Sequence, residues 1–273
     1  MAAGEDVGSR DFTYFGIQSS WGVTKHLGGR KATDRLVELC SITPDSRVLE
    51  IGCGVGISAC HLAKKVGCSL TSVDLNEPML TWARKRAQRE CLSGLITFRV
   101  ADAQHLPFGE DTFDAVISES VTAFAADKGR AVSEYLRVLK PGGRVGLTEA
   151  SWVQSPPPTA LVEFFARAME GAAFLEPEGW TSLLADGGFV DVRSEVFHLT
   201  ALGQLASDLS GQSPRDVGDR LRAMGTFLRQ VLTDVDMRRY AKTLMPSPRT
   251  MRDLFTYFGY GIYTGTKARE QQP

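Results

Sequence analysis

The sequence predicts an α/β fold in which helices cover both faces of a largely parallel, doubly wound sheet. Three observations predict this fold. First, a short apolar run at 47–51 is typical of a buried parallel strand, and it enters a glycine turn at 52–56. Second, the segment 57–65 directly after the turn has helical character, which completes the first half of a βαβ unit. Third, strand-like and helix-like runs alternate from there to residue 149.

Composition indicates a globular protein with one large domain, or a domain with an insertion. The chain has 273 residues, of which 43% are hydrophobic and 23% charged, and its formal net charge is -1. This balance provides no general attraction to nucleic acids or to anionic membranes. Because no run of about 18 apolar residues occurs and residues 1–10 lack an apolar signal core, we expect a cytoplasmic protein without a membrane partner.

The cysteine pattern bears on metals and disulfides. The chain has 5 cysteines, an odd number, and none of them has Cys-x-x-Cys spacing. Both features argue against a disulfide framework and against a zinc site. We therefore expect free, mostly buried thiols and no bound metal.

The N-terminal segment 1–29 is expected to form a tail and a lid. Residues 1–11 are small and polar and are expected to be disordered. Aromatic residues at 12–15 and at Trp21 then precede a helix predicted at 31–40. These aromatic residues either staple the N-terminus to the core or cover the cofactor and substrate, and the two roles are compatible.

An acidic residue ends the second predicted strand, 69–73. Asp74 lies 18 residues beyond Gly56 (74 − 56), close to the spacing at which an acid meets ribose hydroxyls in nucleotide-binding folds. A carboxylate accepts two hydrogen bonds from a vicinal diol, so this position favours ribose binding. The alternative is a helix cap, in which Asn76 or Asp74 begins the helix predicted at 77–90.

Later segments continue the alternation and then add helices. Strands are predicted at 96–100, 111–118, 144–149, 189–197 and 258–265, and helices at 130–139, 161–169 and 180–185. Lys140-Pro141-Gly142-Gly143 is expected to terminate the helix before it. The segment 200–255 has amphipathic helical spacing. We interpret 200–256 as a helical cap inserted over the active site, with a homodimer surface as the alternative.

The glycine turn departs from the dinucleotide fingerprint. In that fingerprint the third glycine would fall on position 57, which is Ile57 here. The observed pattern, Glu-x-Gly-x-Gly-x-Gly from Glu50 to Gly56, resembles motif I of the class I S-adenosylmethionine-dependent methyltransferases. The loop at 101–108 and the phrase at 136–143 resemble further motifs of that family, in the same order along 47–150. The resemblance implies a Rossmann-like seven-stranded sheet whose last strand is antiparallel.

The resemblance also implies which residues hold S-adenosylmethionine. Gly52 and Gly54 would flank its methionine part, and Glu50 would position its charged amino acid end. Asp102 would accept from the adenine amine, and Ala103 would supply a backbone N–H. A plain turn capped by Asp102 is the alternative. The full set assigned to the cofactor is Glu50, Gly52, Gly54, Gly56, Asp74, Leu75, Asp102, Ala103 and Ser118.

Methyl transfer from this cofactor needs alignment more than catalytic groups, because the sulfonium already activates the methyl. A base is needed only where the acceptor must lose a proton. Glu119, His26 and His105 are candidates, and Glu119 leads because it follows the fourth strand. The residues at 118–121 lack the Asn/Asp-Pro-Pro-Tyr motif of amide-directed enzymes, and no Pro-Cys pair offers a nucleophile for cytosine. These absences count against nucleic acid substrates.

We therefore predict a methyltransferase that acts on a small molecule, with 30–199 as the core and 257–273 as the last strand and tail. A protein that binds the cofactor without catalysis, or that methylates a protein partner, is the first alternative. An NAD-dependent oxidoreductase is the second, which Ile57 disfavours. The sequence does not identify the acceptor or its attacking atom.

Overall fold

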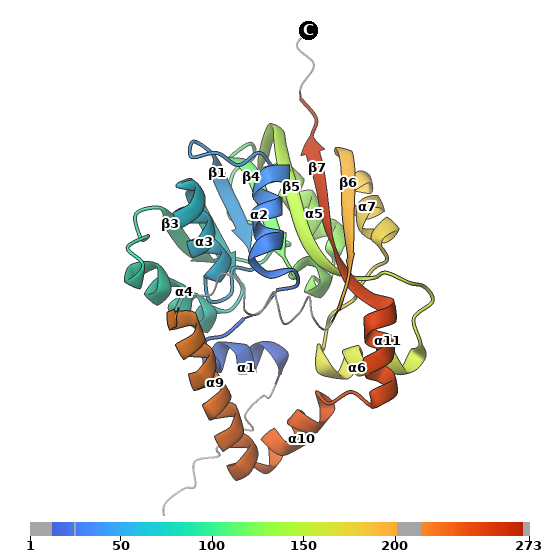
Figure 1. Cartoon of the computed structure of the whole chain (residues 1–273). Coiled ribbons are helices and arrows are strands. Elements are labelled where there is room, and N and C mark those ends of the chain that lie inside the picture. The colour runs from blue at the N-terminus through green and yellow to red at the C-terminus, as the bar shows by residue number, and fades with distance from the viewer. Residues whose placement is uncertain (1–12, 25, 201–213, 270–273) are drawn as a thin grey trace, which may run out of the picture.

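The computed structural model describes residues 13–24, 26–200 and 214–269, and it is built on a seven-stranded sheet (Figure 1). The strands are β1 Arg47–Ile51, β2 Ser69–Asp74, β3 Ile96–Val100, β4 Phe113–Glu119, β5 Leu139–Trp152, β6 Phe189–His198 and β7 Phe258–Lys267. Their order is β3-β2-β1-β4-β5-β7-β6, and β7 is antiparallel to both of its neighbours. The predicted fold class is confirmed.

Helices cover both faces of this sheet because buried side chains alternate along the strands. Val48 of β1 packs in the cluster with α2 (Gly29–Leu39), α3 (Ile57–Val66) and α4 (Glu77–Arg89). Its neighbour Leu49 points to the opposite face and packs in the cluster with α5 (Lys128–Val138) and α7 (Pro177–Asp186). The sheet is therefore wound on both sides, and the chain changes direction between β1 and β4.

The helix cap proposed for 77–90 is made by Asn76 and not by Asp74. Asn76 Oδ1 accepts from the backbone N–H of Met79 at 3.2 Å, which satisfies one of the free donors at the start of α4. The Asp74 carboxylate instead accepts a hydrogen bond from the glycine turn.

The element boundaries that differ from the prediction include the starts of β4 and β5. β4 begins at Phe113 and not at Asp111, because Asp111 has a left-handed φ of 54° and lies in a turn. β5 begins at Leu139, so the segment 140–143 belongs to that strand and not to a turn after α5. The pairing passes from Phe113↔Leu139 to Ala115↔Arg144, so the extra residues of β5 form a bulge.

Further helices gather at the carboxyl-terminal end of β1 (Figure 1). They are α1 Tyr14–Trp21, α6 Thr159–Ala168, α9 Pro214–Thr233, α10 Val235–Thr243 and α11 Pro248–Tyr257. The short 3-10 helix η1, Thr122–Phe124, follows β4. Helix α1 was not predicted, although Thr13 caps its start and Gly22 ends it in the left-handed conformation. The predicted disorder of 1–11 and the first residues of the predicted cap, 201–213, lie outside the described residues.

The cysteines are free, and four of them, Cys40, Cys53, Cys60 and Cys68, are buried, whereas Cys91 is exposed. Within the described ranges, no helix is long and apolar enough to cross a membrane. The same ranges contain no cluster of histidine, cysteine and carboxylate side chains that could hold a metal ion.

Candidate functional site

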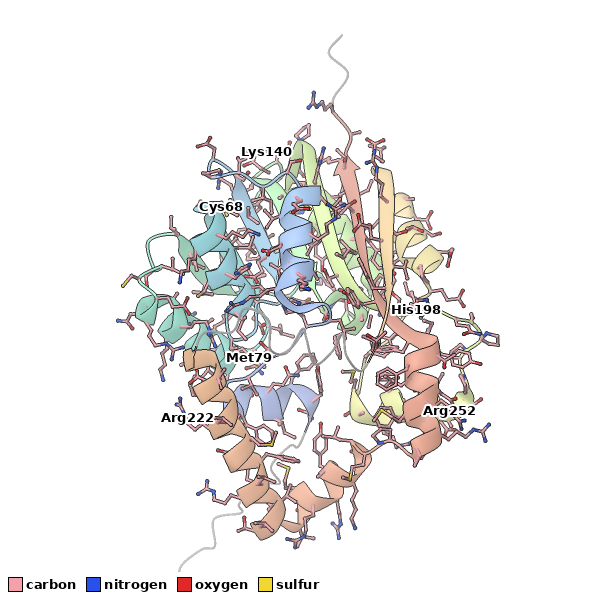
Figure 2. The ribbon with its side chains drawn as sticks, viewed as in Figure 1. Cys68, Met79, Lys140, His198, Arg222 and Arg252 are labelled. Atoms are coloured by element: carbon pink, nitrogen blue, oxygen red, sulfur yellow. The ribbon has the colours of Figure 1, made fainter. Side chains whose placement is uncertain are left out.

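A cavity of about 520 Å³ lies at the carboxyl ends of β1, β2, β3 and β4, where an open α/β sheet binds its ligands. Of the predicted site residues, the cavity brings together Glu50, Gly52, Gly54, Asp74, Leu75, Asp102, Ala103, Glu119 and His26. Met79, which also lines the cavity, lies near this end of the sheet, and Cys68 and Lys140 lie at the other end (Figure 2).

The glycine turn brings backbone to the cavity because side chains cannot be placed there. Gly52 has φ 68°, and a Cβ on it would lie 2.2 Å from Cγ2 of Val121. Gly54 has φ 53°, and its Cβ would lie 2.8 Å from Cγ2 of Thr24. Both positions therefore require glycine, on grounds of conformation and of space.

Three predicted residues are not among those that line the cavity. Gly56 is the N-terminal cap of α3, and a Cβ on it would lie 2.9 Å from the Cβ of Ala83, so this glycine allows α3 and α4 to pack closely. Ser118 is fully buried, and its hydroxyl lies 3.1 Å from that of Thr122. His105 is exposed and also lies outside the cavity.

Asp74 connects the second strand to the glycine turn. Its Oδ2 accepts from the N–H of Gly54 at 2.8 Å, and its Oδ1 accepts from the N–H of Asn76 at 2.9 Å. Burial raises the pKa of this carboxyl, which the backbone donors partly oppose. Since a carboxylate has about four acceptor positions, each oxygen keeps one for a ligand. The neighbouring Leu75 is 71% exposed and supplies an apolar wall beside it.

Glu50 is a buried carboxyl at the end of β1. It is only 3% exposed, and the hydroxyl of Ser72 donates to its Oε2 at 2.6 Å. Burial is the main cause that raises its pKa to about 8, the negative charges of Glu119 and Asp74 add to the rise, and the hydrogen bond from Ser72 opposes it. A carboxyl held in this way is poised to ionise when a cation binds next to it.

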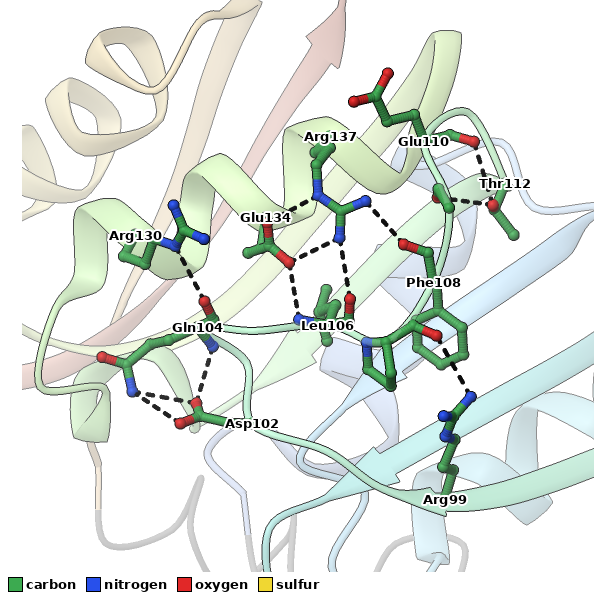
Figure 3. Close-up of polar contacts among 12 residues, drawn as sticks. Arg99, Asp102, Gln104, Leu106, Phe108, Glu110, Thr112, Arg130, Glu134 and Arg137 are labelled. Carbon is green, nitrogen blue, oxygen red and sulfur yellow. Dashed lines mark hydrogen bonds and ion pairs between the residues drawn. The ribbon is translucent and has the colours of Figure 1, made fainter.

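The loop 101–108 is fixed from helix α5 (Figure 3). Glu134 Oε2 accepts from the N–H of Leu106 at 2.8 Å, while Arg137 donates to the carbonyls of Leu106 at 3.0 Å and Phe108 at 2.8 Å. Asp102 accepts from the N–H of Gln104 at 2.8 Å, so it caps a turn and also lines the cavity. The two alternatives given for Asp102 are thus geometrically compatible.

Replacing Arg137 with methionine is expected to lower the free energy of unfolding by about 2 kcal/mol. The substitution removes both bonds to the loop and leaves the buried Glu134 carboxylate without the guanidinium that holds its pKa below the usual range. Urea denaturation measures the change. The matched control is Arg130→Met on the same helix, because Arg130 is exposed and makes one bond to the carbonyl of Gln104. An equal loss in both variants would contradict this role for Arg137.

Glu119 and His26 lie together beside the cavity. Glu119 is 9% exposed, and its Oε1 accepts from the hydroxyl of Thr33 at 2.8 Å. His26 Nδ1 lies 3.3 Å from the same Oε1, within ion-pair distance but without hydrogen-bond geometry, and His26 Nε2 lies 3.4 Å from the hydroxyl of Ser58. In the described part of the chain, the buried side-chain polar atoms without a hydrogen-bond partner are Glu119 Oε2, His26 Nδ1 and Thr148 Oγ1.

Glu149 supports the site and was missed by sequence reasoning. This fully buried carboxylate of β5 accepts from the backbone N–H groups of Thr122 at 2.7 Å and Val121 at 3.2 Å, and so fixes the turn after β4. Burial raises its pKa to about 7, and these donors oppose the rise. The available signal was an acid near the end of a predicted strand, two residues after Leu147 and next to Ala150, because a buried charge needs local partners.

Comparison with known proteins identifies the family. Residues 49–147 match the family described as "Methyltransferase domain". The chain is 33% identical over 181 residues to a relative named "Uncharacterized methyltransferase YodH" from Bacillus subtilis, which covers 64% of this chain and 74% of that protein.

Two solved structures share the fold at 20% sequence identity. The [4+2]-cyclase SpnF has a TM-score of 0.71, with 93% of this chain and 92% of that chain covered. Phosphoethanolamine N-methyltransferase 2 of Haemonchus contortus, solved with phosphomonomethylethanolamine and S-adenosylhomocysteine, has a TM-score of 0.67. The match covers 93% of this chain but only 57% of the Haemonchus protein. Taken with the YodH match, the sheet order and the glycine turn, these findings show that the chain belongs to the class I S-adenosylmethionine-dependent methyltransferases.

Proposed function

We propose that this protein transfers the methyl group of S-adenosylmethionine to a small-molecule acceptor by direct in-line attack. The observation that carries the proposal is the meeting of three acids, Glu50, Asp74 and Asp102, around one cavity beside a turn that only glycine can form. The acids come from the ends of β1 and β2 and from the loop after β3, so they are spread along the cavity. An elongated ligand could contact all three.

Each acid suits one part of the cofactor. The buried Glu50 carboxylate would face the ammonium group of the methionine part, where a cation offsets the cost of its ionisation. Asp74 would accept from the ribose hydroxyls with the acceptor positions that Gly54 and Asn76 leave free. Asp102 would accept from the adenine amine, and Leu75 would pack against the adenine ring.

Glu119 and His26 are assigned to the acceptor. The nucleophile of the acceptor forms a bond to the methyl carbon while the bond from carbon to sulfur breaks, which leaves neutral S-adenosylhomocysteine. The proton of the nucleophile passes to Glu119 Oε2, the carboxylate oxygen without a partner in the described residues. The hydroxyl of Thr33 donates to Oε1 and orients the carboxylate, and His26 lies on the same side.

We assign helix α1 as a lid and α9 to α11 as the cap that completes the site. Tyr14, Phe15 and Gln18 of α1 line the cavity, and the indole N–H of Trp82 donates to the carbonyl of Ser19 at 2.9 Å. None of the α1 side chains is fully buried, so the helix can move when ligands enter without exposing a core side chain.

The proposal is tested by incubating the purified protein with methyl-labelled S-adenosylmethionine and a fractionated cell extract. We expect label in the small-molecule fraction, and mass spectrometry of the product then identifies the acceptor. Label only in protein or nucleic acid would contradict the proposal. Binding of S-adenosylmethionine without any transfer would favour a cofactor-binding protein instead.

Cofactor affinity is expected to rise with pH, by up to about tenfold per pH unit between about pH 5 and 7. Burial raises the pKa of Glu50 from 4.5 to about 8, and the ammonium of the cofactor requires the carboxylate, so binding below pH 8 releases a proton. Titration calorimetry at several pH values measures the trend. Glu50→Gln is expected to flatten it, and an unchanged slope in that variant would contradict the role of Glu50.

The raised pKa of Glu50 has the opposite effect on the stability of the free protein, which falls as the pH rises. Because the folded-state pKa of Glu50 is raised, its contribution to stability is complete below 4.5 and is lost as the pH rises through about 8. Glu149, with a pKa raised to about 7, contributes in the same direction. Comparison of wild type with Glu50→Gln therefore isolates the contribution of Glu50.

A further inference from the structure

A second cavity, of about 280 Å³, lies between α1, α6, α9 and α10, and we call it the apolar chamber. Its walls are Tyr14, Ile17, Gln18, Trp21, Phe164, Phe165, Ala168, Met169, Phe227, Tyr240 and Leu244. No charged side chain is among these described residues. The chamber is therefore lined almost completely by aromatic and aliphatic carbon.

Polar groups of two wall residues on α1, Trp21 and Tyr14, have partners inside the protein. The indole N–H of Trp21 donates to Gln230 Oε1 at 3.2 Å, and its ring meets that of Phe227 edge-on at a centroid distance of 5.4 Å. The hydroxyl of Tyr14 is hydrogen-bonded to Gln18, and burial raises its pKa. Since these two groups are already paired and the other walls are mostly apolar, a ligand gains little from placing a polar group beside α1, and apolar groups are preferred there.

The apolar chamber adjoins the cofactor cavity. Tyr14 and Gln18, four residues apart and so on one face of α1, line both cavities. The ring of Tyr14 also stacks on that of Phe124 in η1, which closely follows Glu119, the last residue of β4. One side of α1 thus borders the proposed site of transfer, and the adjoining side borders a space without charge.

We propose that the apolar chamber binds the hydrocarbon part of the methyl acceptor, so that the acceptor is an amphiphile with a nucleophilic head and an uncharged apolar tail. This inference rests on the proposed function. An engineered apolar cavity of about 150 Å³ holds one benzene molecule, so the chamber has room for about two such rings or a medium alkyl chain.

The position of the chamber in the chain supports a role in choosing the acceptor. All its walls lie outside residues 49–147, the part that matches the family. Residues assigned to the cofactor lie within the matched part of the chain, whereas the walls of the apolar chamber come from α1, α6, α9 and α10. Elements outside a shared core are where binding specificity is most often located.

The probes for this inference are the 1-alkanols with 4, 6, 8 and 10 carbons, titrated calorimetrically into the protein saturated with S-adenosylhomocysteine. Each methylene that enters the chamber should tighten binding about fourfold, so that eight carbons bind about 200-fold tighter than four. Binding should also show a negative heat-capacity change. Absence of any dependence on chain length, with S-adenosylhomocysteine bound, would overturn the inference and leave the proposed function intact.

Two variants separate the chamber from nonspecific binding. Ala168→Leu adds carbons inside the chamber and should weaken octanol binding at least tenfold with little effect on butanol. Leu228→Ala, on α9 beside Phe227 but exposed and not a wall residue, should change neither. Equal effects of the two variants would overturn the inference. Both should retain affinity for S-adenosylhomocysteine, and failure of the wild-type protein to bind that compound would contradict the proposed function itself.

The labelled transfer experiment gives an independent measurement. Extraction of the labelled product with an organic solvent should recover it in the organic phase, as the tail requires. Recovery of the labelled small molecule only in the aqueous phase would overturn the amphiphile inference while it supports methyl transfer.

Discussion

Replacing Asp74 with alanine is expected to weaken S-adenosylmethionine binding by a factor of about 100 to 1000. Two contributions combine. The variant loses the proposed charge-assisted bonds to the ribose hydroxyls, and it also releases the N–H of Gly54, which Asp74 now holds at 2.8 Å. A turn that is free to move then presents its backbone to the cofactor less often, which lowers affinity again. Titration calorimetry with S-adenosylmethionine measures the loss.

Asp114→Ala is the matched control for Asp74. Asp114 also accepts from a backbone N–H, that of Arg47 at 2.8 Å, and it pairs with Lys140. It lies on β4 near the end of the sheet opposite the cavity, where Lys140 is seen in Figure 2. The control should lose stability but keep its cofactor affinity. Retention of wild-type affinity in Asp74→Ala would show that the ribose is held by other groups.

The sheet could be predicted from sequence because its signals are local. The run at 47–51, the glycine turn and Asp74 each specify a strand, a turn or a strand end by their own residue types. The order of such units then restricts the topology, since crossovers between parallel strands are right-handed. The residues assigned to the cofactor that line the cavity could be brought together in the same way, because they follow the ends of consecutive strands.

Helix α1 and the bulge in β5 could not be predicted from local sequence signals of this kind. Tyr14–Trp21 contains Gly16 and two serines and has no buried residue, so its helical periodicity is weak and the caps Thr13 and Gly22 are its main marks. The segment 140–143 has the residues of a turn, yet Leu139 before it pairs with β4 and Arg144 after it pairs with both β4 and β7, so the strand continues through it. In both cases contacts from distant segments decide the conformation.

The part of the site assigned to the acceptor was even harder to predict from sequence, because it depends on packing between segments that are far apart in the chain. Thr33 bonds Glu119 across 86 positions, and Trp21 bonds Gln230 across 209. No motif connects such pairs, and aromatic residues at 164 and 165 were equally consistent with plain core. Only the folded chain shows that they enclose a second cavity next to the first.

Replacing Glu119 with glutamine is expected to lower the rate of methyl transfer to the identified acceptor by a factor of about 100 to 10000. Glutamine keeps the size of the side chain and can still accept from the hydroxyl of Thr33, but it cannot take the proton of the nucleophile. The cofactor dissociation constant should change by less than about tenfold, because the assigned cofactor ligands remain. Single-turnover transfer of labelled methyl measures the rate, and calorimetry measures the affinity.

Thr33→Val and Glu195→Gln complete this experiment. Valine removes the hydroxyl that orients Glu119 without changing the size of the side chain, so the rate should fall about fivefold and recover in Thr33→Ser. Glu195 lies on β6, pairs with Arg35 and does not line the cavity, so its glutamine variant should transfer methyl at the normal rate. If Glu119→Gln binds the cofactor and turns over as fast as wild type, the nucleophile loses no proton to Glu119. The site then acts by alignment alone, which cofactor chemistry of this kind permits because the sulfonium already activates the methyl group.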